Sequence, residues 1–311
     1  MTTSPAAARL RIVFAGSPAA AVPSLRRLAA SAHDIVAVIT REDSPQGRKG
    51  SLTPTAVATV ALELGIPTIK ANRLAGDATI AIEKLSPDLG VIVAYGGLLR
   101  EPLLSAPALG WINLHYSLLP RWRGAAPVQR AIIAGDEVTG ATVFHLVEEL
   151  DAGDVLGQLS EPIGRLQTAG SLLESLSSSG AGLLLSVVNS LAAGTAQAKP
   201  QVGEVTVAPK LNLPDGEIDW SETASEISSR IRGVTPEPGA FTSVDSARLK
   251  VLDAAIAHDV APLPPGQFAL AGKTVVVGTA TLPIELISVH PAGRKAMDAA
   301  SWWRGRQAAQ E

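Results

Sequence analysis

The residues best suited to chemistry in this sequence are Asn113 and His115, two apart in the apolar run Trp111-Ile-Asn-Leu-His115. If this run forms a β-strand, both side chains project from the same face. Ser117-Leu-Leu-Pro120 then ends the strand. In open α/β sheets, ligands bind along the edge formed by the carboxyl ends of the strands. The run therefore predicts a pair of polar side chains at a ligand-binding edge.

A third group that could serve this edge is Asp151, in an acidic segment that follows a predicted strand at residues 139–146. A carboxylate near a histidine raises the histidine pKa and orients the ring, which suits acid–base catalysis near neutral pH. A side-chain amide such as that of Asn113 can stabilise an oxyanion. The competing interpretation is a buried histidine whose polar neighbours serve only the fold.

Composition removes several other kinds of chemistry. The chain of 311 residues has no cysteine, so disulfides, thiolate nucleophiles and cysteine zinc sites are excluded. Its five histidines are widely spaced and form no HExxH pair, so we expect no metal. Ser117 lacks the flanking glycines of a nucleophile elbow. The remaining chemistry is direct transfer between two bound substrates, through proximity and charge stabilisation.

The rest of the first 193 residues predicts the sheet that would hold this edge. Strands at 10–15 and 34–40 enclose a helix at 19–30, which indicates a βαβ unit and a parallel sheet. The turn at Gly16 has one glycine, so a dinucleotide fingerprint is absent. We expect an α/β, doubly wound, mostly parallel Rossmann-like sheet. Its other predicted elements are helices at 55–64, 77–85, 128–134 and 171–191, and strands at 66–69, 89–94, 139–146 and 155–163, besides the strand that carries Asn113 and His115.

A chain of this length favours two domains. Residues 194–207 have few large apolar side chains and are the predicted linker. Beyond them, short segments rich in β-branched residues alternate with glycine and proline, which suggests a small β-barrel. We therefore predict a catalytic domain at residues 1–193 and a second domain at 208–311. The second domain should contain helices at 224–232 and 299–309, and strands at 247–255, 266–271, 274–278 and 282–289.

Charge and terminal composition limit the partners. The formal net charge is −3, and residues 210–311 carry ten lysines and arginines against twelve aspartates and glutamates. Any phosphate-binding surface must therefore be local. Arg48 and Lys49 at the tip of a polar loop, residues 41–54, could bind phosphate or form an ordinary solvated tip. No signal peptide and no uncharged apolar run of membrane-spanning length is visible, so we expect a cytoplasmic protein without membrane association.

Seven segments spread over nearly the whole chain carry a family resemblance. They are Phe14-Ala-Gly-Ser-Pro18, Val93-Ala-Tyr-Gly96, the stretch 112–127, Leu150-Asp-Ala-Gly-Asp154, Ile218-Asp-Trp220, Ile231-Arg-Gly233 and the stretch 291–297. In these segments the sequence resembles the methionyl-tRNA formyltransferases. The run Asn113-Leu-His-Tyr-Ser-Leu-Leu-Pro120 is specific to folate-dependent formyltransferases and their relatives.

The resemblance implies transfer of the formyl group of 10-formyltetrahydrofolate, a co-substrate, to the α-amine of methionyl initiator tRNA. The products would be tetrahydrofolate and the N-formylmethionyl-tRNA used in translation initiation. Asn113, His115 and Asp151 match the family's catalytic residues. In that scheme the amine attacks the formyl carbonyl, and His115 and Asn113 stabilise the oxyanion. Asp151 would keep His115 charged and assist proton removal.

The resemblance also implies binding residues. Ser117, Leu118, Leu119 and Pro120 match the family's folate-binding segment. The loop with Arg48 and Lys49 resembles the flexible loop that contacts the tRNA acceptor end, and the second domain resembles an OB-like barrel that helps hold the tRNA. Because that domain is not basic overall, we expect a local patch at Arg294 and Lys295, with Arg304 and Arg306 nearby. We expect a monomer.

Other functions remain open from sequence. A folate-dependent formyltransferase acting on a small amine, such as glycinamide ribonucleotide or an amino sugar nucleotide, would share Asn113, His115 and Asp151. A formyltetrahydrofolate hydrolase would use water as the acceptor. A non-catalytic RNA-binding protein is a further alternative, against which the intact set of three residues argues. The segments Ile218-Asp-Trp220 and 291–297 favour the tRNA enzyme.

Overall fold

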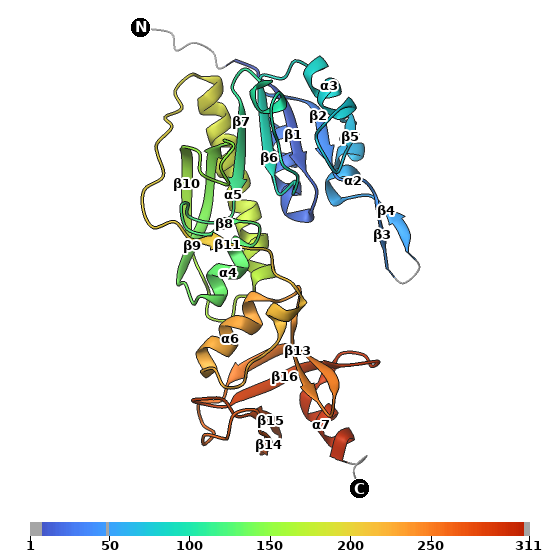
Figure 1. Ribbon diagram of the computed structural model, residues 1–311, viewed down its shortest axis with the longest axis vertical. Coiled ribbons are helices and arrows are strands. Elements are labelled where there is room, and N and C mark those ends of the chain that lie inside the picture. Colours follow the sequence, from blue (N-terminus) through green and yellow to red (C-terminus); the bar gives the residue numbers. More distant parts are fainter. Residues whose placement is uncertain (1–7, 48–49, 308–311) are drawn as a thin grey trace. The chain divides into compact units, whose positions relative to one another are not determined.

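The structure is a computed structural model that describes residues 8–47 and 50–307 (Figure 1). Arg48 and Lys49, predicted to reach phosphate, lie outside the described residues. The chain divides into two compact units. The first consists of the chain up to Pro127 with residues 138–162 and 173–208, and the second of residues 128–137, 163–172 and those from 209 onward.

The first unit is built on a seven-stranded sheet with the order β10-β9-β7-β6-β1-β2-β5 (Figure 1). Six of its strands run in the same direction, and β9, between β7 and β10, is antiparallel to both of its neighbours. The central strands are continuous apolar runs because both faces of a parallel sheet are covered. This confirms the predicted mostly parallel α/β sheet. The strands are β1 (Arg11–Gly16), β2 (Asp34–Thr40), β5 (Thr68–Lys70), β6 (Leu89–Val93), β7 (Trp111–His115), β9 (Val138–His145) and β10 (Val155–Pro162).

The strand order reverses at β1, because β2 and β5 lie on one side of it and β6 and β7 on the other. The carboxyl ends of β1 and β6 therefore form the topological switch point where α/β sheets bind ligands. A Cβ atom on Gly16, which ends β1, would lie only 2.9 Å from the Val93 carbonyl oxygen. The close approach of these two strand ends explains the single glycine in this turn.

The helices of this unit begin and end where local chemistry predicts. Thr55 caps α2, because its side chain accepts a hydrogen bond from the backbone N–H of Ala58. The long helix α5 lies against the sheet at Gly180, where a Cβ atom would be 3.2 Å from a methyl carbon of Leu114. The helices are α1 (Val22–Ala29), α2 (Ala56–Glu63), α3 (Asp77–Lys84) and α5 (Ala169–Ala192), the last of which begins in the second unit.

Helix α5 is also long and apolar enough, by length and composition, to cross a membrane, with a mean hydropathy of 1.3. It is the one described helix with this property. A helix at the core of a water-exposed domain passes the same test, and Leu176, Leu184 and Val188 of α5 are fully buried against the rest of the chain. Packing therefore accounts for part of the apolar composition of α5.

Two segments expected to be irregular contain short strands. The polar loop at 41–54 includes a hairpin of β3 (Ser44–Gln46) and β4 (Ser51–Thr53), so its description as a loop is wrong in this part. Its strands are exposed and polar, which is why no apolar periodicity marked them. The second pair is parallel and joins β8 (Arg123–Gly124) to β11 (Val207–Ala208). The end of the predicted linker thus pairs with the turn that follows β7.

The second unit holds an antiparallel sheet with the order β12-β13-β16-β15-β14, and β17 pairs with β16. This is the smaller C-terminal β-domain predicted from the spacing of its strands. A capping box between Thr223 and Glu226 begins α6, and Gly233 at the end of α6 brings its backbone against Ile133 of α4. The elements are α4 (Pro127–Ile133), α6 (Ala224–Gly233), β12 (Ala240–Val244), β13 (Ala247–Ile256), β14 (Phe268–Ala271), β15 (Thr274–Val277), β16 (Ile284–Pro291), β17 (Met297–Asp298) and α7 (Ala299–Gln307).

Candidate active site

Trp111, the first residue of β7, fixes the position of the strand that carries Asn113 and His115. The Trp111 ring lies over Gly90 of β6, where a Cβ atom would be 2.1 Å from the ring, and its Nε1 donates to the Leu103 carbonyl at 2.8 Å. This packing sets the register of β7, in which Asn113 pairs with residues of both β6 and β9. His115 is the last residue of β7, at the carboxyl end of the sheet's parallel strands.

Asp151 reaches His115 through the connection between β9 and β10. That connection begins beside the start of β7, where the Leu146 N–H donates to the Trp111 carbonyl at 2.8 Å. It then runs back along β7, because Asp151 Oδ2 lies 3.6 Å from Nδ1 of His115. Gly153 permits the return, since a Cβ atom there would be 1.8 Å from the His145 carbonyl oxygen. The two side chains predicted to meet therefore do meet.

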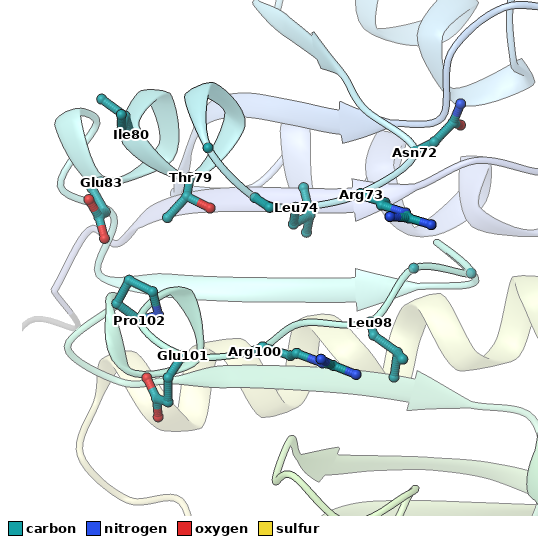
Figure 2. Close-up of a pocket in the computed structure, with 14 residues that line it drawn as sticks. Asn72, Arg73, Leu74, Thr79, Ile80, Glu83, Leu98, Arg100, Glu101 and Pro102 are labelled. Atoms are coloured by element: carbon teal, nitrogen blue, oxygen red, sulfur yellow. The ribbon is translucent and has the colours of Figure 1, made fainter.

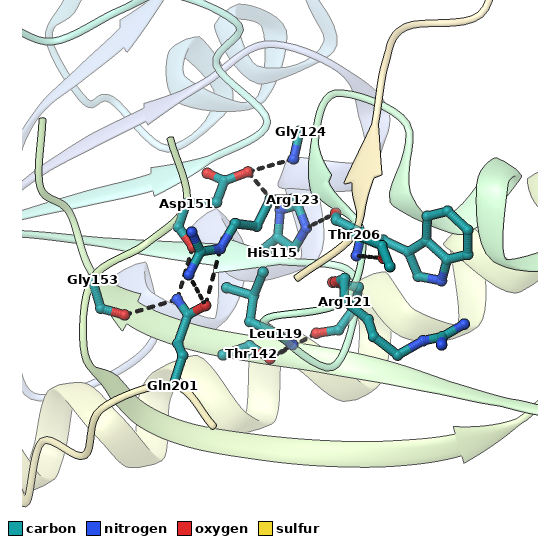
Figure 3. A network of polar contacts seen from close by, with 12 residues as sticks. His115, Leu119, Arg121, Arg123, Gly124, Thr142, Asp151, Gly153, Gln201 and Thr206 are labelled. Atoms are coloured by element: carbon teal, nitrogen blue, oxygen red, sulfur yellow. Dashed lines mark hydrogen bonds and ion pairs between the residues drawn. The ribbon is translucent and has the colours of Figure 1, made fainter. Parts of the chain in front are cut away.

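The pair is buried and held on both sides (Figure 3). The side chains of His115 and Asp151 are 6% and 11% exposed. Asp151 Oδ2 accepts a hydrogen bond from the Gly124 N–H at 2.7 Å, and His115 Nε2 lies 2.8 Å from the Trp122 carbonyl oxygen. Asn113 is half-buried on the same face of β7, two residues before His115.

The contacts of His115 assign its protons. A carbonyl oxygen can only accept, so Nε2 carries the hydrogen and donates to Trp122. In the neutral ring Nδ1 then has a lone pair, and 3.6 Å to Asp151 is too long for a hydrogen bond. A proton added at Nδ1 would complete an ion pair with the carboxylate. The pair is therefore built to take up one proton.

The expectation that Asp151 keeps His115 charged is wrong in its net effect. Burial lowers the pKa of His115 below its ordinary value, and this outweighs the opposing influences of the Asp151 carboxylate and the hydrogen bond to Trp122. The neighbouring carboxylate alone would raise this pKa, but the loss of hydration on burial disfavours the charged imidazole. His115 is therefore neutral near pH 7 in the free protein and is available as a proton acceptor.

We expect the lowered pKa of His115 to appear in stability. Between its folded pKa and about 6.5, the unfolded chain binds more protons than the folded chain, so stability rises with pH in this window. His115→Ala should flatten this rise by at most about 1.4 kcal/mol per pH unit. Urea denaturation from pH 5 to 7 measures it. Burial also lowers the pKa of His145, so the pH slope of stability in His145→Ala is the comparison. A slope in His115→Ala that equals the wild-type slope would contradict the lowered pKa of His115.

Two residues that contact His115 have strained backbones. Trp122 has φ of 61° and Asp151 has φ of 48°, in the left-handed region that non-glycine residues rarely adopt. Such conformations cost on the order of 1–3 kcal/mol each and concentrate at functional sites. At Trp122 the conformation accompanies a carbonyl directed at His115. The strain therefore favours a built site over a histidine buried only for the fold.

The Ser117-Leu-Leu-Pro120 segment forms a buried turn tied to β9 and β10. Thr142 Oγ1 donates to the Ser117 carbonyl at 2.6 Å, and the Leu119 N–H donates to Thr142 Oγ1 at 3.2 Å. Ser117 Oγ donates to the Arg121 carbonyl at 2.6 Å. Ser117, Leu119 and Pro120 are buried, and Leu118 is partly exposed. Leu118 is thus the side chain of this segment that a ligand can reach.

A separate cavity of about 900 Å³ lies in the first unit between α3 and the segment after β6. Figure 2 shows Arg73, Arg100 and Leu98 at one end of it and Glu83 and Glu101 at the other. Its lining comes from residues 72–83 and 96–102, so Asn113, His115 and Asp151 do not line it. This large hollow is therefore distinct from the His115 and Asp151 pair.

In the second unit, Arg294 lines a groove of about 310 Å³ together with Arg248, Trp302 and Arg306. Arg306 is ion-paired with Asp245 at 2.8 and 2.9 Å, which reduces its availability to phosphate. Lys295 is exposed beside Arg294. Of the predicted basic residues, Arg294 and Arg306 thus line one groove of the second unit with Trp302, and Lys295 and Arg304 do not line it.

Sequence reasoning missed three groups around the pair. They are the Trp122 carbonyl, the Gly124 N–H and Gln201, whose side chain contacts the segment that holds Asp151. Backbone groups leave no signal in residue types, and Gln201 lies in the stretch interpreted as a linker. Within the described residues, no group of three histidines, aspartates or glutamates is arranged to hold a metal ion.

Comparison with known proteins gives the chain its family. The formyl transferase family matches residues 10–188, and the formyl transferase C-terminal domain matches residues 210–307. A methionyl-tRNA formyltransferase of Clavibacter sepedonicus is 58% identical over 296 residues, which cover 95% of this chain and 97% of that protein. One of Leifsonia xyli subsp. xyli is 55% identical over 301 residues, with coverage of 95% and 97%.

Solved structures with lower identity share the fold. WlaRD, described as a sugar 3N-formyl transferase, superposes with a TM-score of 0.66 at 15% identity, covering 92% of this chain and 98% of that one. HypX from Aquifex aeolicus superposes with a TM-score of 0.67 at 17% identity, covering 96% of this chain and 48% of that one. Matched by both domain families and by full-length relatives, the chain belongs to the formyl transferase family and, within it, to the methionyl-tRNA formyltransferases.

Proposed function

We propose that this protein transfers the formyl group of 10-formyltetrahydrofolate to the α-amine of methionyl initiator tRNA in the cytoplasm. The observation that carries the proposal is the buried pair of His115 and Asp151, whose Nδ1 and Oδ2 atoms lie 3.6 Å apart. His115 belongs to the strand that also bears Asn113, and Asp151 belongs to the connection between β9 and β10. It occurs in a chain that is 58% identical to a methionyl-tRNA formyltransferase along almost its whole length. In this proposal residues 1–193 carry out the transfer and residues 208–311 bind tRNA.

The reaction needs one proton to leave the amine and one to reach the leaving nitrogen. The amine nitrogen attacks the formyl carbon, a carbon–nitrogen bond forms, and the carbonyl oxygen becomes an oxyanion. The oxyanion then re-forms the carbonyl as the bond from the formyl carbon to N10 of the folate breaks, and N10 takes up the proton that left the amine. Asn113 supplies an amide N–H for the oxyanion. The His115 and Asp151 pair accepts the amine proton at Nδ1, where the carboxylate stabilises it.

The protonated pair also supplies charge. Once Nδ1 holds the proton, the imidazolium lies beside the developing oxyanion and stabilises it electrostatically. A direct hydrogen bond from His115 to the formyl oxygen would require Nε2 to leave the Trp122 carbonyl. Burial strengthens either interaction, because the local dielectric is lower than that of water. Asn113 is therefore the direct donor in this scheme and His115 the proton acceptor.

Folate and tRNA would contact different parts of the chain. The partly exposed Leu118, on the turn formed by Ser117, Leu119 and Pro120, offers an apolar contact to the folate. Arg294 and Lys295 offer phosphate contacts in the second unit, and Arg48 and Lys49 are proposed to approach the acceptor end. We propose that no metal takes part and that the chain works as a monomer.

The proposal is tested by single-turnover transfer of labelled formyl from 10-formyltetrahydrofolate. Purified protein should give labelled N-formylmethionyl-tRNA with charged initiator tRNA. Glycinamide ribonucleotide, an amino sugar nucleotide and water are the competing acceptors, measured in parallel as formylated amine or free formate. Product from a small amine, with none from charged tRNA, would assign the protein to the alternative function.

Replacing Arg294 and Lys295 by alanine is expected to weaken tRNA binding and reduce its salt dependence. For every phosphate that the variant no longer neutralises, the slope of log K against log salt should fall by roughly 1. The Arg294 carbonyl accepts from His290 at 2.7 Å, so the turn itself should persist. Lys273→Ala, at an exposed glycine-containing turn of the same unit, is the matched control. An unchanged salt slope in the double variant would remove these residues from the tRNA-binding surface.

A further inference from the structure

Gln201 lies between the two segments that contact His115, and all four of its hydrogen bonds go to them (Figure 3). Its Nε2 donates to the Asp151 carbonyl at 2.7 Å and to the Gly153 carbonyl at 2.9 Å. Its Oε1 accepts from Arg123 at 2.8 and 3.2 Å. Because carbonyls only accept and a guanidinium only donates, these partners determine the orientation of the amide.

These bonds go to Asp151, which lies against His115, and to residues close in sequence to those that contact His115. The backbone of Asp151 is strained, and its side-chain carboxylate faces Nδ1 of His115. A hydrogen bond that holds the Asp151 backbone carbonyl therefore limits the directions in which the carboxylate can point. Arg123 lies between Trp122, whose carbonyl accepts from Nε2, and Gly124, whose N–H donates to the Asp151 carboxylate. One amide side chain thus connects both sides of the imidazole.

The chain around Gln201 is itself firmly attached to the first unit. Lys199 exchanges two backbone hydrogen bonds with Val155 of β10, at 2.7 and 2.9 Å. Thr206 accepts from the Trp122 N–H through Oγ1 and from the Arg123 N–H through its carbonyl, both at 2.9 Å. Gln201 therefore contributes its amide from a backbone anchored on both sides.

From this arrangement we infer that Gln201 is a positioning residue for formyl transfer, which holds the Asp151 carboxylate and the Trp122–Gly124 turn at their working distances from His115. The inference rests on the proposed function, because it assigns Gln201 a role in that reaction. The competing explanation is that Gln201 only attaches residues 199–208 to the first unit. The two explanations differ in whether the environment of the imidazole depends on Gln201.

The main test variant is Gln201→Met, which has a similar length and no amide. We expect it to slow single-turnover formyl transfer by roughly 10- to 100-fold, the effect of a small misplacement of reacting groups. The KM for tRNA should stay unchanged. The NMR titration of His115 should move to lower pH, because a displaced Asp151 raises the imidazole pKa less. Gln197→Met, an exposed glutamine in the same segment, is the matched control and should match the wild type.

Two further variants keep the test decisive. Gln201→Glu retains an acceptor for Arg123 but has no donor for the Asp151 and Gly153 carbonyls. A reduction in rate similar to that of Gln201→Met supports the inference. Adding Gln201→Met to Asp151→Asn should slow the reaction by clearly less than the product of the two separate reductions, because part of the effect of Gln201 passes through Asp151. Two rate reductions that multiply would overturn the inference.

The outcomes separate this inference from the proposed function. If the wild-type protein transfers no formyl to charged initiator tRNA, the proposed function fails. If Asp151→Asn is slow but Gln201→Met has a normal rate and a normal His115 titration, the inference alone fails. Gln201→Met could also be slower only because less of the protein is folded, with an unchanged titration of His115. That result overturns the inference and supports the explanation that Gln201 only attaches residues 199–208 to the first unit.

Discussion

Replacing His115 by alanine is expected to slow formyl transfer by roughly 10²- to 10⁴-fold, the usual contribution of a positioned acid–base group. The variant has no Nδ1 to take the amine proton beside Asp151, and no imidazolium forms near the oxyanion. The fold should persist, because β7 is held by Trp111 and by pairing with β6 and β9. Single-turnover rates at saturating folate and tRNA, with circular dichroism to confirm folding, measure the effect.

The matched control is His258→Ala, which makes the same change at an exposed position of the second unit. It should transfer formyl at the wild-type rate. A His115→Ala protein that is folded and fully active would show that the pair is structural. A reduction in activity that appears only through a higher KM for tRNA would instead place His115 in binding.

Asp151→Asn is expected to reduce the rate by roughly 10²- to 10⁴-fold, in the range of other acid–base groups. An amide oxygen can still accept from the Gly124 N–H, so the turn should keep its shape. The negative charge that stabilises a protonated His115 is absent, however, so the pKa of His115 should fall further. The pH dependence of the single-turnover rate and the His115 NMR titration test both consequences.

Asp154→Asn provides the control in the same connection, because Asp154 is exposed and pairs with β9 through its backbone carbonyl. Its rate should match that of the wild type. Wild-type activity in Asp151→Asn would exclude the carboxylate from the reaction. An equal reduction in rate in both variants would point to disruption of the whole connection rather than to the charge of Asp151.

The sequence by itself determined the sheet and the side chains available to it. Apolar runs such as Ile12–Ala15 are typical of a strand covered on both faces, and the strand–helix–strand order of residues 10–40 then predicted the parallel sheet. The spacing of Asn113 and His115 put them on one face of β7, and the absence of cysteine removed covalent thiol chemistry. These conclusions depend on residue type and short-range periodicity.

The tertiary structure alone decided how the site works. Only the path of the β9–β10 connection brings Asp151 to 3.6 Å from His115. Only burial determines that the pKa of His115 is lowered, because desolvation depends on everything packed around the ring. Gln201, 50 residues after Asp151, joins the site through hydrogen bonds to backbone carbonyls, which have no sequence signature. Such contacts arise from chain folding, so residue pattern could not predict them.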